Sequence, residues 1–452
     1  MQLPVQLLTA LETTKGFDRK SFEAVHASNE QVTSIRINPL KASTTSPNPQ
    51  ILKSPNHPVP WSQYGFYLET RPSFTFDPLF HAGCYYVQEA SSMFLEQALK
   101  QTLDLSQSLK VLDLCAAPGG KSTHIQSLIS KDSLLVSNEV IRSRTNILKD
   151  NIIKWGCDNV MVTHNDPADF AKMSGYFDVI VIDAPCSGSG LFRRDQAAIE
   201  EWSLANVQLC SQRQQRILAD VWPALKENGI LIYSTCSYSK EEDEEIVNWL
   251  LQDLSIVNCP LPIDASWGIV ESGGGYRFWP DKVKGEGLFL ACFRKTGEER
   301  TTAIKIKNKP EQATQSESVI IDKWVKSEGL RFIKHKQTVY GWPEKLADDF
   351  SFLLNQLRVA YSGTIIGELL RDKLVPDHSL AMSTKITDNI QRIALDYDRA
   401  IQYLQRKELL PGNMTKGWQL VTYEGQILGW VNVLSNRINN YYPKELRILK
   451  DK

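Results

Sequence analysis

Residues 109–123 of this chain read LKVLDLCAAPGGKST. Apolar residues typical of a buried strand lead into a turn that contains two glycines, and helix-forming residues follow. Glycines at such a turn let the backbone approach a ligand closely, and the first N–H groups of the helix are free to bind it. The segment therefore predicts a strand, a helix and, between them, a cofactor-binding loop formed by Cys115, Ala116, Ala117, Pro118, Gly119, Gly120 and Lys121.

Two common nucleotide-binding motifs do not fit this turn. A P-loop requires GxxxxGK[ST], and with Gly120-Lys121 in place its first glycine would fall at Cys115. Pro118 also removes an N–H group from any phosphate nest. The dinucleotide motif GxGxxG fails because only Gly119 and Gly120 are available.

The alternation of strands and helices continues to about residue 295. Apolar strand-like runs occupy residues 109–117, 133–140, 159–166, 177–185 and 229–237, and helical runs occupy residues 122–130, 142–154, 206–228 and 241–252. Apolar strands separated by helices are typical of an α/β fold with a parallel sheet covered on both faces. Two further runs, at residues 276–278 and 287–293, predict a final hairpin that carries an antiparallel strand.

Two acidic residues close the strands that follow the loop. Glu139 ends the second strand, where folds of this type bind a ribose hydroxyl, and Asp166 ends the third, where it can meet an adenine amino group. The loop and the two acids suit a nucleoside cofactor without a pyrophosphate, such as S-adenosyl-L-methionine. They also fit a tight turn with acidic caps at two strand ends, so a cofactor site is a hypothesis at this point.

Cys186 and Cys236 each follow a strand of the predicted sheet. The carboxyl ends of parallel strands line the ligand crevice, so both thiols are expected to face the cofactor. A thiolate that adds to C6 of a pyrimidine makes C5 able to take a methyl group from a sulfonium; C5 then loses its proton and the thiol leaves. Two thiols and Asp183 suffice for attack, release and hydrogen bonding at the N3/N4 edge of the ring. Two cysteines that only pack in the core are the alternative.

Composition restricts the function further. The chain has 452 residues, 42% hydrophobic and 23% charged, and a net charge of −1, so nucleic-acid binding is left to local patches. Its eight cysteines form no CxxC pair and its seven histidines no HExxH motif, so we expect neither a disulfide framework nor a metal site. The sequence shows no secretion signal and no apolar run that could span a bilayer, so we expect no membrane partner and a cytoplasmic location.

The regions on either side of the α/β segment differ from it. Residues 1 to about 95 combine strand-like and aromatic segments and predict a small α+β extension. Residues 301–318 are polar, charged and nearly free of aromatic residues, as linkers are. Beyond them, two strand-like runs at residues 417–423 and 426–431, joined by Glu424-Gly425, predict a β-hairpin in a small, separate domain.

The motifs together resemble those of the Nol1/Nop2/Sun family of RNA cytosine-C5 methyltransferases. The resemblance rests on DLCAAPGGKST, DAPCSGSG, YSTCS with its acidic run and GEGLFLACFRK, and on SIRINPLK and CYYVQEASSM upstream. It implies a Rossmann-like domain with a mostly parallel, seven-stranded sheet that binds S-adenosyl-L-methionine through the loop, Glu139, Asp166 and Asp183. It also implies that Cys236, in the Thr-Cys motif of RNA enzymes, is the nucleophile and that Cys186 assists product release.

The C-terminal part resembles the bacterial 16S rRNA branch of that family, the RsmF/YebU-like proteins, whose tail carries a PUA-like RNA-binding module. The matching segments are residues 377–382, 416–418, 428–430 and 440–447. The resemblance implies RNA, in particular 16S rRNA or the small ribosomal subunit, as the partner of a monomeric enzyme. It implies an N-terminal RNA-binding extension, a methyltransferase domain, a linker and a PUA-like RNA-binding region at residues 1–95, 96–296, 297–318 and 319–452.

Several other residues are candidates for contacts with RNA. Arg193 and Arg194 follow Cys186 and suit phosphates beside a target base, although an ordinary solvated pair fits equally well. The acidic run at residues 241–245 is interpreted as a helix start, where carboxylates suit the helix dipole. C-terminal aromatic residues can stack on bases, but we expect most of them to be core: Trp418, Trp430, Tyr441 and Tyr442.

Three functions remain open on these grounds. The first is methylation of C5 of a cytidine in rRNA, and the second is the same chemistry on tRNA. The third is a non-catalytic RNA-binding factor in ribosome assembly, which the intact Cys186 and Cys236 disfavour. An amino-group methyltransferase is expected to carry [ND]PP[YF] where this chain has DAPC, so that reaction is disfavoured as well.

Overall fold

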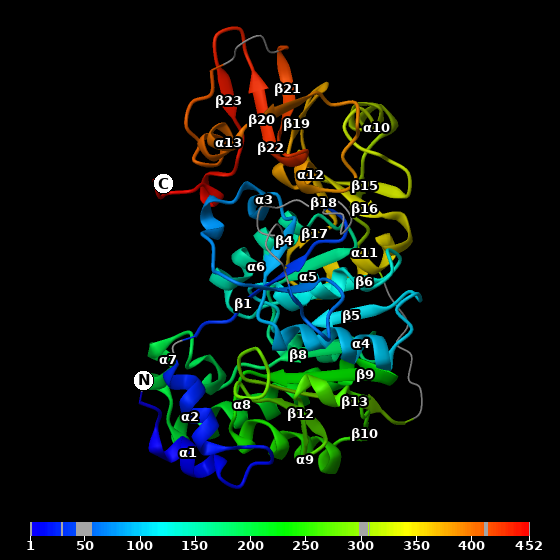
Figure 1. The fold of residues 1–452 in the computed structure, drawn as a ribbon. Helices are drawn as coiled ribbons and strands as arrows, with labels where there is room; N and C mark the ends of the chain where they lie inside the picture. Colours follow the sequence, from blue (N-terminus) through cyan, green and yellow to red (C-terminus); the bar gives the residue numbers. More distant parts are fainter. Residues whose placement is uncertain are drawn as a thin grey trace.

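A broad mixed sheet forms the centre of the computed structural model, which describes residues 2–28, 30–41, 57–297, 306, 308–410 and 415–451. The strand order is β11-β12-β13-β9-β8-β5-β6-β7-β17, and β10 also pairs with β13 (Figure 1). The five strands from β5 to β9 run parallel, as their apolar sequences predict. Their bounds are Lys110–Asp113 (β5), Leu134–Asn138 (β6), Val160–Thr163 (β7), Phe177–Asp183 (β8) and Leu225–Thr235 (β9).

Five further strands widen this sheet. The strand β13 (Leu288–Lys295) is antiparallel to β9 and to both β10 (Ile256–Asn258) and β12 (Gly275–Phe278). Since β10 therefore points the same way as β9, the strands β5 to β10 with β13 form the expected seven-stranded, mostly parallel sheet. The additions β12, β11 (Val270–Ser272) and β17 (Val359–Ser362) bring the sheet to ten strands.

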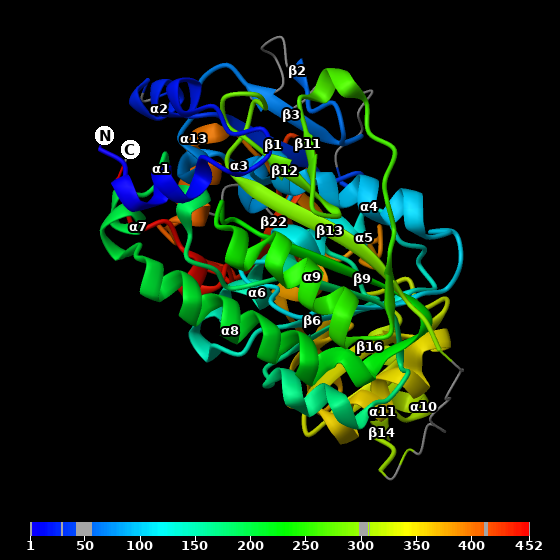
Figure 2. The ribbon, with the colours of Figure 1, turned by 90° about the horizontal axis from the view of Figure 1, so that it is seen from below.

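Helices cover both faces of the sheet, because alternate side chains of each strand point to opposite sides. On one face α8 (Leu204–Val221) and α9 (Glu244–Asp253) pack in a core that includes Leu112 of β5. The other face, with Val111, carries three helices, and Figure 2 shows α4 and α8 on opposite sides of β9 and β13. The three are α4 (Leu95–Thr102), α5 (Gly120–Gln126) and α6 (Arg142–Trp155).

The N-terminal extension consists of helices followed by a small antiparallel sheet with the order β2-β3-β1-β4. The helices α1 (Val5–Leu11) and α2 (Arg19–Ala27) pack against Phe192 and Trp279, at the end of the molecule opposite β20–β23 (Figure 1). The sheet lies against the central α/β domain and the C-terminal region. The remaining elements are β1 (Thr33–Ile37), β2 (His57–Pro58), β3 (Gly65–Leu68), α3 (Pro78–His81) and β4 (Tyr85–Val87).

The C-terminal region holds two small sheets, ordered β14-β15-β16-β18-β19 and β20-β21-β22-β23. Glu424 and Gly425 have φ angles of 46° and 79°, so the predicted hairpin turns through two left-handed residues. The strands are β14 (Glu311–Gln312), β15 (Leu330–His335), β16 (Thr338–Pro343), β18 (Thr364–Leu370), β19 (Lys373–Pro376), β20 (Arg392–Leu395), β21 (Gly417–Tyr423), β22 (Gln426–Val433) and β23 (Ile438–Asn440). The helices are α10 (Gln315–Ile321), α11 (Ala347–Gln356), α12 (His378–Met382) and α13 (Tyr397–Leu404).

This region is not the separate unit that the sequence analysis expects. The strand β17 pairs antiparallel with β7 at the edge of the central sheet, and Phe350 and Leu353 of α11 enter the core beneath α8. Tyr403 and Val431 share a second core with Ile35 of the N-terminal extension. The surfaces that join the regions are made of ordinary apolar side chains, which a composition shift does not reveal.

Local boundaries also differ from the sequence analysis. The helix expected at residues 206–228 ends at Val221, because β9 begins at Leu225, and the helix expected at 241–252 begins at Glu244 after a 3₁₀ turn. In the expected linker at 297–318, residues 298–305 and 307 lie outside the described residues, and α10 begins inside it. Within the described ranges, every helix is too short or too polar to cross a lipid bilayer.

Candidate active site

The two cysteines of interest meet at the carboxyl edge of the central sheet. The strands β8 and β9 are parallel neighbours, with Asp183 of β8 opposite Ser234 of β9, so the loops after both strands leave on the same side. The sulfur atoms of Cys186 and Cys236 lie 3.0 Å apart, and both side chains are partly exposed. This arrangement places two thiols within reach of one reacting atom.

An ion pair lies at the end of the neighbouring strands. The Lys121 ammonium contacts Oδ2 of Asp183 at 2.7 Å, and the Ser234 hydroxyl donates to Oδ1 of the same carboxylate at 2.9 Å. Burial lowers the pKa of Lys121, but the charge of Asp183 and the hydrogen bond to it outweigh that effect and leave the pKa raised. Lys121, predicted as part of the cofactor loop, therefore reaches the side of the site where the thiols lie.

The surroundings of Cys186 favour its protonated form. The hydrogen bond with Cys236 raises the pKa of Cys186, burial adds to the effect, and the negative charge of Glu242 adds further. Cys186 therefore keeps its proton and can donate it toward the sulfur of Cys236. One protonated thiol beside a second one suits a nucleophile that has a proton donor at its side.

The predicted cofactor loop runs from the end of β5 to α5, and α6 fixes its shape. Gly119, with φ at 113°, precedes the first residue of α5 in a left-handed conformation that favours glycine. Arg144 donates to the carbonyl oxygen of Ala117 at 2.8 Å, and Asn151 donates to that of Pro118 at 2.8 Å. These two hydrogen bonds direct the carbonyl groups of Ala117 and Pro118 toward α6. The opposite side of the loop faces the carboxyl edge of the sheet.

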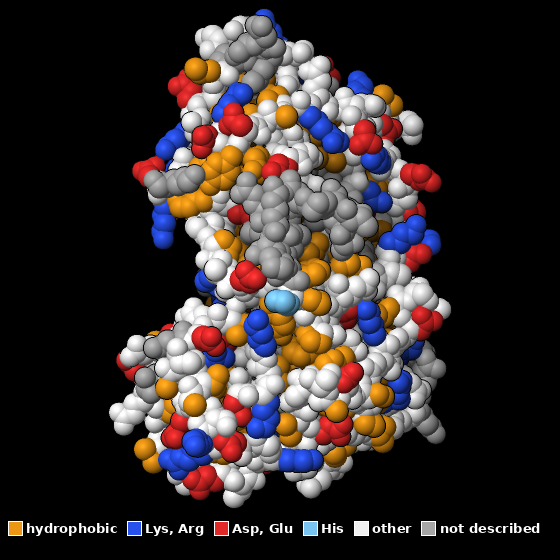
Figure 3. Space-filling view, in the orientation of Figure 1, with side chains coloured by type: hydrophobic (Ala, Val, Ile, Leu, Met, Phe, Trp, Pro, Cys, Tyr) orange, Lys and Arg blue, Asp and Glu red, His pale blue; other side chains and the backbone are white. Residues whose placement is uncertain are grey.

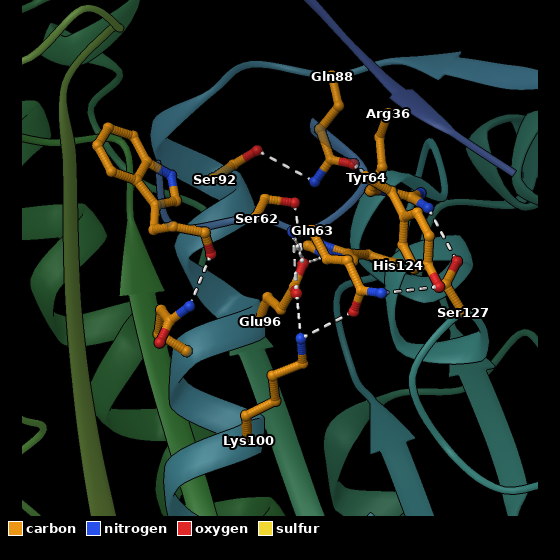
Figure 4. A network of polar contacts seen from close by, with 12 residues as sticks. Arg36, Ser62, Gln63, Tyr64, Gln88, Ser92, Glu96, Lys100, His124 and Ser127 are labelled. Carbon is orange, nitrogen blue, oxygen red and sulfur yellow. Dashed lines mark hydrogen bonds and ion pairs between the residues drawn. The ribbon is translucent and has the colours of Figure 1, made fainter. Parts of the chain in front are cut away.

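The N-terminal extension also contacts α5, through the fully buried side chain of Arg36 (Figure 4). The Arg36 guanidinium donates to Thr123 Oγ1 at 2.6 Å, to Ser127 Oγ at 3.0 Å and to the Gly120 carbonyl at 3.2 Å. It also donates to Gln88 at 2.8 Å and lies over the Trp155 ring, with 4.5 Å to the ring centre. The helix that follows the cofactor loop is therefore tied to β1.

A buried carboxylate joins the other side of α5 to the same extension (Figure 4). Glu96 of α4 accepts from Ser62 Oγ at 2.9 Å, from the Gln63 amide at 3.1 Å and from Lys100 at 2.5 Å. Burial lowers the pKa of His124 to about 4, so this α5 side chain is neutral and donates to Glu96 at 3.1 Å. Four donors satisfy one carboxylate, and the network fixes α4 and α5 against the extension.

Three carboxyl groups lie along the strand ends where the cofactor is expected. Glu139 is buried and accepts from the Ile141 amide at 2.9 Å, and Asp166, at the end of β7, is more exposed and caps the turn that follows. Sequence analysis did not single out Asp113, although it is the last residue of β5. Burial raises the pKa of Asp113 to about 7, and its Oδ1 atom has no hydrogen-bond partner among the described residues. An orphaned buried acceptor beneath the loop fits a cofactor that carries a positive charge.

The acidic run after Cys236 starts the helix α9, as expected: Asp243 is the N-cap residue, and Glu244 and Glu245 lie in the first turn. Glu242 and Asp243 are in addition fully buried. The side chain of Asp243 accepts from Thr235 Oγ1 at 2.6 Å and lies 3.1 Å from the Arg277 guanidinium. No sequence signal distinguishes these two from the exposed Glu245, because burial depends on how the turn meets the cysteine loops.

Arg193 and Arg194 separate into two environments. Arg193 is 9% exposed and donates to the carbonyls of Gly285 at 3.0 Å and Glu30 at 2.6 Å, so neither the solvated-pair nor the phosphate interpretation fits it. Arg194 is exposed, and the phosphate interpretation stays a prediction for this residue alone. The sequence does not distinguish the buried arginine from the exposed one, since the two are adjacent in the same polar loop.

The C-terminal aromatic residues are mostly core, as expected. Trp430 and Tyr442 are buried and Trp418 is half-buried, whereas Tyr441 is 40% exposed beside Trp418. Lys416, on the same β21–β22 sheet, is exposed. Over the face seen in Figure 3, basic and acidic side chains are interspersed, which agrees with the near-neutral net charge of −1.

This fold and site define the class of Rossmann-like, S-adenosylmethionine-dependent methyltransferases. A family model described as 16S rRNA methyltransferase RsmB/F matches residues 100–294, the N-terminal domain of RsmF matches residues 3–90 and the RsmF PUA domain matches residues 391–448. The chain belongs to the ribosomal RNA small subunit methyltransferase F family. The cofactor that the loop predicts is therefore S-adenosyl-L-methionine.

Individual relatives agree along almost the whole chain. Ribosomal RNA small subunit methyltransferase F of Vibrio vulnificus is 30% identical over 91% of this chain and 90% of its own length. The protein of the same name from Shewanella piezotolerans is 30% identical over 93% and 91%. Both alignments include the C-terminal region as well as the methyltransferase domain.

Solved structures resemble about two thirds of the chain. A methyltransferase homologue from Pyrococcus horikoshii is 28% identical, with a TM-score of 0.53, over 65% of this chain and 100% of that one. NSun6 from the same organism is 19% identical, with a TM-score of 0.55, over 65% and 99%, which shows a shared fold.

Proposed function

We propose that this protein methylates C5 of a cytidine in RNA, with 16S rRNA as the substrate, and that it acts as a cytoplasmic monomer. The observation that carries the proposal is the 3.0 Å contact between Cys186 and Cys236 at the carboxyl ends of β8 and β9. C5 of cytosine is a poor nucleophile until a thiol adds to C6, and few other methyl transfers call for a thiol pair beside the cofactor loop. S-adenosyl-L-methionine, when bound by the loop, Glu139, Asp166 and Asp183, supplies the methyl group.

Cys236 is the nucleophile in this proposal. Its sulfur forms a bond to C6, and the electrons of the C5–C6 double bond become available at C5 to take the methyl group. Cys186 is less suited to attack because its raised pKa keeps it protonated. The carboxylate of Asp183 can accept a hydrogen bond from the N4 amino group of the ring, while Lys121 compensates its charge at 2.7 Å.

Cys186 assists the release step. A base takes the C5 proton, the C5–C6 double bond forms again, and the bond between C6 and Cys236 breaks with its electron pair returning to sulfur. A protonated thiol 3.0 Å from that sulfur stabilises the departing thiolate by donating to it. A target base within RNA secondary structure has to leave its stack to reach Cys236, at a cost of a few kcal/mol.

The choice of 16S rRNA rests on the relatives and on the C-terminal region. The Vibrio and Shewanella proteins are named as methyltransferases of small-subunit ribosomal RNA, and they match this chain through its C-terminal region. The RsmF PUA domain match covers the strands β21 to β23. A PUA-like module that binds RNA outside the catalytic site would select the substrate.

Bisulfite sequencing of rRNA and tRNA from cells with and without this gene tests the proposal. We expect one 5-methylcytosine to disappear from 16S rRNA and to return when the gene is restored. Loss of a 5-methylcytosine from tRNA alone would support the proposed reaction and contradict 16S rRNA as the substrate. An unchanged pattern in both RNAs would contradict the reaction and favour a non-catalytic role in ribosome assembly.

A further inference from the structure

Glu242 is a fully buried carboxylate directly beneath the two cysteine loops. Its Oε1 atom accepts from the Ser187 amide at 2.8 Å and from Gln214 Nε2 at 3.1 Å. Its Oε2 atom accepts from the hydroxyls of Ser187 at 2.5 Å and Ser237 at 2.7 Å. Four donors converge on one carboxylate, which is the arrangement that makes a buried acid tolerable.

The donors come from the residues that follow the two thiols. Ser187 is next to Cys186, and Ser237 is next to Cys236. One side chain therefore bonds to both cysteine loops at once, although the loops are far apart in the sequence. Charge-assisted hydrogen bonds of this kind are roughly twice as strong as neutral ones.

Neighbouring contacts also join the two loops, and one of them is a side-chain link, since the Ser189 hydroxyl accepts from the Tyr238 amide at 2.8 Å. The Gly190 amide donates to the carbonyl of Cys236 at 2.7 Å, and a Cβ atom at Gly190 would lie only 2.5 Å from that oxygen. Gln214 of α8 also donates to the carbonyl of Pro185 at 3.1 Å. These contacts fix the backbone, while the hydroxyls of Ser187 and Ser237 are held by the carboxylate.

We propose that Glu242 is a positioning residue that holds Cys186 and Cys236 in contact for catalysis. This inference rests on the proposed function, since it assigns a role in the same reaction. Without the carboxylate, the buried Ser187 amide and two hydroxyls lose their acceptor, and only the remaining contacts between the loops then position the two thiols. A displacement of about 1 Å at a reacting group costs roughly 100-fold in rate.

Three variants separate positioning from folding and from charge. Glu242→Ala removes every acceptor of the link. Glu242→Gln keeps one carbonyl oxygen for the Ser187 amide and Gln214, while its amide can donate to the serine hydroxyls, which also accept. Glu245→Gln is the matched control, because Glu245 is an exposed carboxylate in the same acidic run.

Two readouts apply to each purified full-length variant. The first is steady-state methylation of the RNA target, reported as kcat and KM with the affinity for S-adenosyl-L-methionine measured separately. The second needs no RNA: diamide oxidises the two thiols to a disulfide and is itself reduced to the hydrazine, and peptide mapping gives the rate at which Cys186 and Cys236 become linked. Both readouts are followed from pH 6 to pH 9.

For Glu242→Ala we expect kcat to fall about 100-fold and the diamide cross-link to form more slowly, while KM and cofactor affinity change less than about twofold. Glu242→Gln should retain more activity than the alanine variant, and its diamide cross-linking should begin at a lower pH than in the wild type, since the negative charge that opposes ionisation of Cys186 is gone. Glu245→Gln should match the wild type in all measurements.

The outcomes distinguish this inference from the proposed function. A wild type that methylates RNA and a Glu242→Ala variant with equal kcat and equal cross-linking rate would overturn the positioning role. A Glu242→Ala variant in which kcat, cofactor affinity and melting temperature all fall would also overturn it, because a joint loss indicates a general folding defect. If the wild type methylates no RNA, the proposed function fails, and the cross-linking rates still decide whether Glu242 holds the thiols together. Should Glu242→Ala not fold, Ser237→Ala, which removes a single donor, provides the same comparison.

Discussion

The sulfur atoms of Cys186 and Cys236 lie 3.0 Å apart, although 50 residues separate them in the sequence. The contact arises because β8 and β9 are parallel neighbours and both chains leave the sheet at the same edge. A thiol that attacks and a thiol that assists release have to reach the same carbon–sulfur bond. Their contact therefore makes a division of labour chemically possible, and single substitutions can separate the two roles.

Cys236→Ala should abolish methyl transfer and leave cofactor binding unchanged, because only the bond to C6 is lost. Methylation of the target RNA and calorimetric titration with S-adenosyl-L-methionine measure the two properties. Cys259→Ala is a suitable control, since the backbone amide of this partly exposed cysteine donates to Cys292 of β13, which lies opposite Ile232 rather than opposite the end of β9. Full activity of Cys236→Ala would show that another group attacks the base.

Cys186→Ala should attack RNA normally but release it slowly, so a covalent protein–RNA adduct should accumulate. The adduct is measured as a slowly migrating band on a denaturing gel that disappears after ribonuclease treatment. The double variant with Cys236→Ala is the control and should give no adduct. If Cys186→Ala turns over without an adduct, the release role is wrong.

Glu139→Ala should weaken binding of S-adenosyl-L-methionine by about 10- to 100-fold, because a charge-assisted hydrogen bond is worth roughly 1.5–3 kcal/mol. Calorimetric titration measures the affinity. Glu139 also accepts from the Ile141 amide just before α6, so the melting temperature is compared with that of Thr145→Ala, which removes another contact at the start of this helix. Unchanged affinity in Glu139→Ala would contradict a ribose contact.

Arg36→Met should lower the free energy of unfolding by about 3 kcal/mol, because buried acceptors on Gly120, Thr123 and Gln88 lose their donor. Urea unfolding measures the change. Cofactor affinity should fall as well, since α5 begins directly after the loop. Arg19→Met, at an exposed arginine of α2, is the control. A variant that is less stable but binds the cofactor normally would show that the loop keeps its shape without Arg36.

Glu286 should make stability fall as the pH rises. Burial raises the pKa of this carboxyl from 4.5 to about 7, and both of its oxygens lack a hydrogen-bond partner among the described residues. The folded protein therefore binds more protons at this carboxyl than the unfolded chain between these values, so the contribution of Glu286 to stability is fully present below pH 4.5 and is lost as the pH rises through 7.

Glu286→Gln removes this titratable carboxyl. Relative to the wild type, the free energy of unfolding of the variant should therefore increase by about 2 to 3 kcal/mol as the pH rises from 5 to 8. Urea unfolding at four pH values measures the difference. Glu245→Gln, at an exposed carboxylate, serves as the control. A wild type and a Glu286→Gln variant with parallel pH profiles would contradict the raised pKa.

Patterns along the sequence predicted the parts of the site that depend on local order. Apolar runs alternating with helices predicted parallel strands, and residues at the ends of such strands gather at one edge; Asp183, Cys186 and Cys236 follow from this rule. The contact of Lys121 with Asp183 could not be predicted in this way, because it requires β5 and β8 to be neighbours in the sheet.

Residues with the same polar character received different environments from the fold. Glu242 turns inward and Glu245 outward from one acidic run, and Arg193 is buried while Arg194 is exposed. The strand β17 joins the central sheet from the far side of a polar segment, because β7 offers an unpaired edge to it. Each of these outcomes depends on a partner distant in the sequence.

The sequence by itself determined the class of fold, the glycine-containing turn between β5 and α5 and the strand ends that carry the two thiols, because each follows from the periodicity and chemistry of a short segment. Tertiary structure alone decided that the thiols touch, that Arg36 holds α5, that Glu242 lies beneath both cysteine loops and that the C-terminal region extends the central sheet. The physical reason is that burial and hydrogen-bond partners are properties of surfaces that meet only when the whole chain packs.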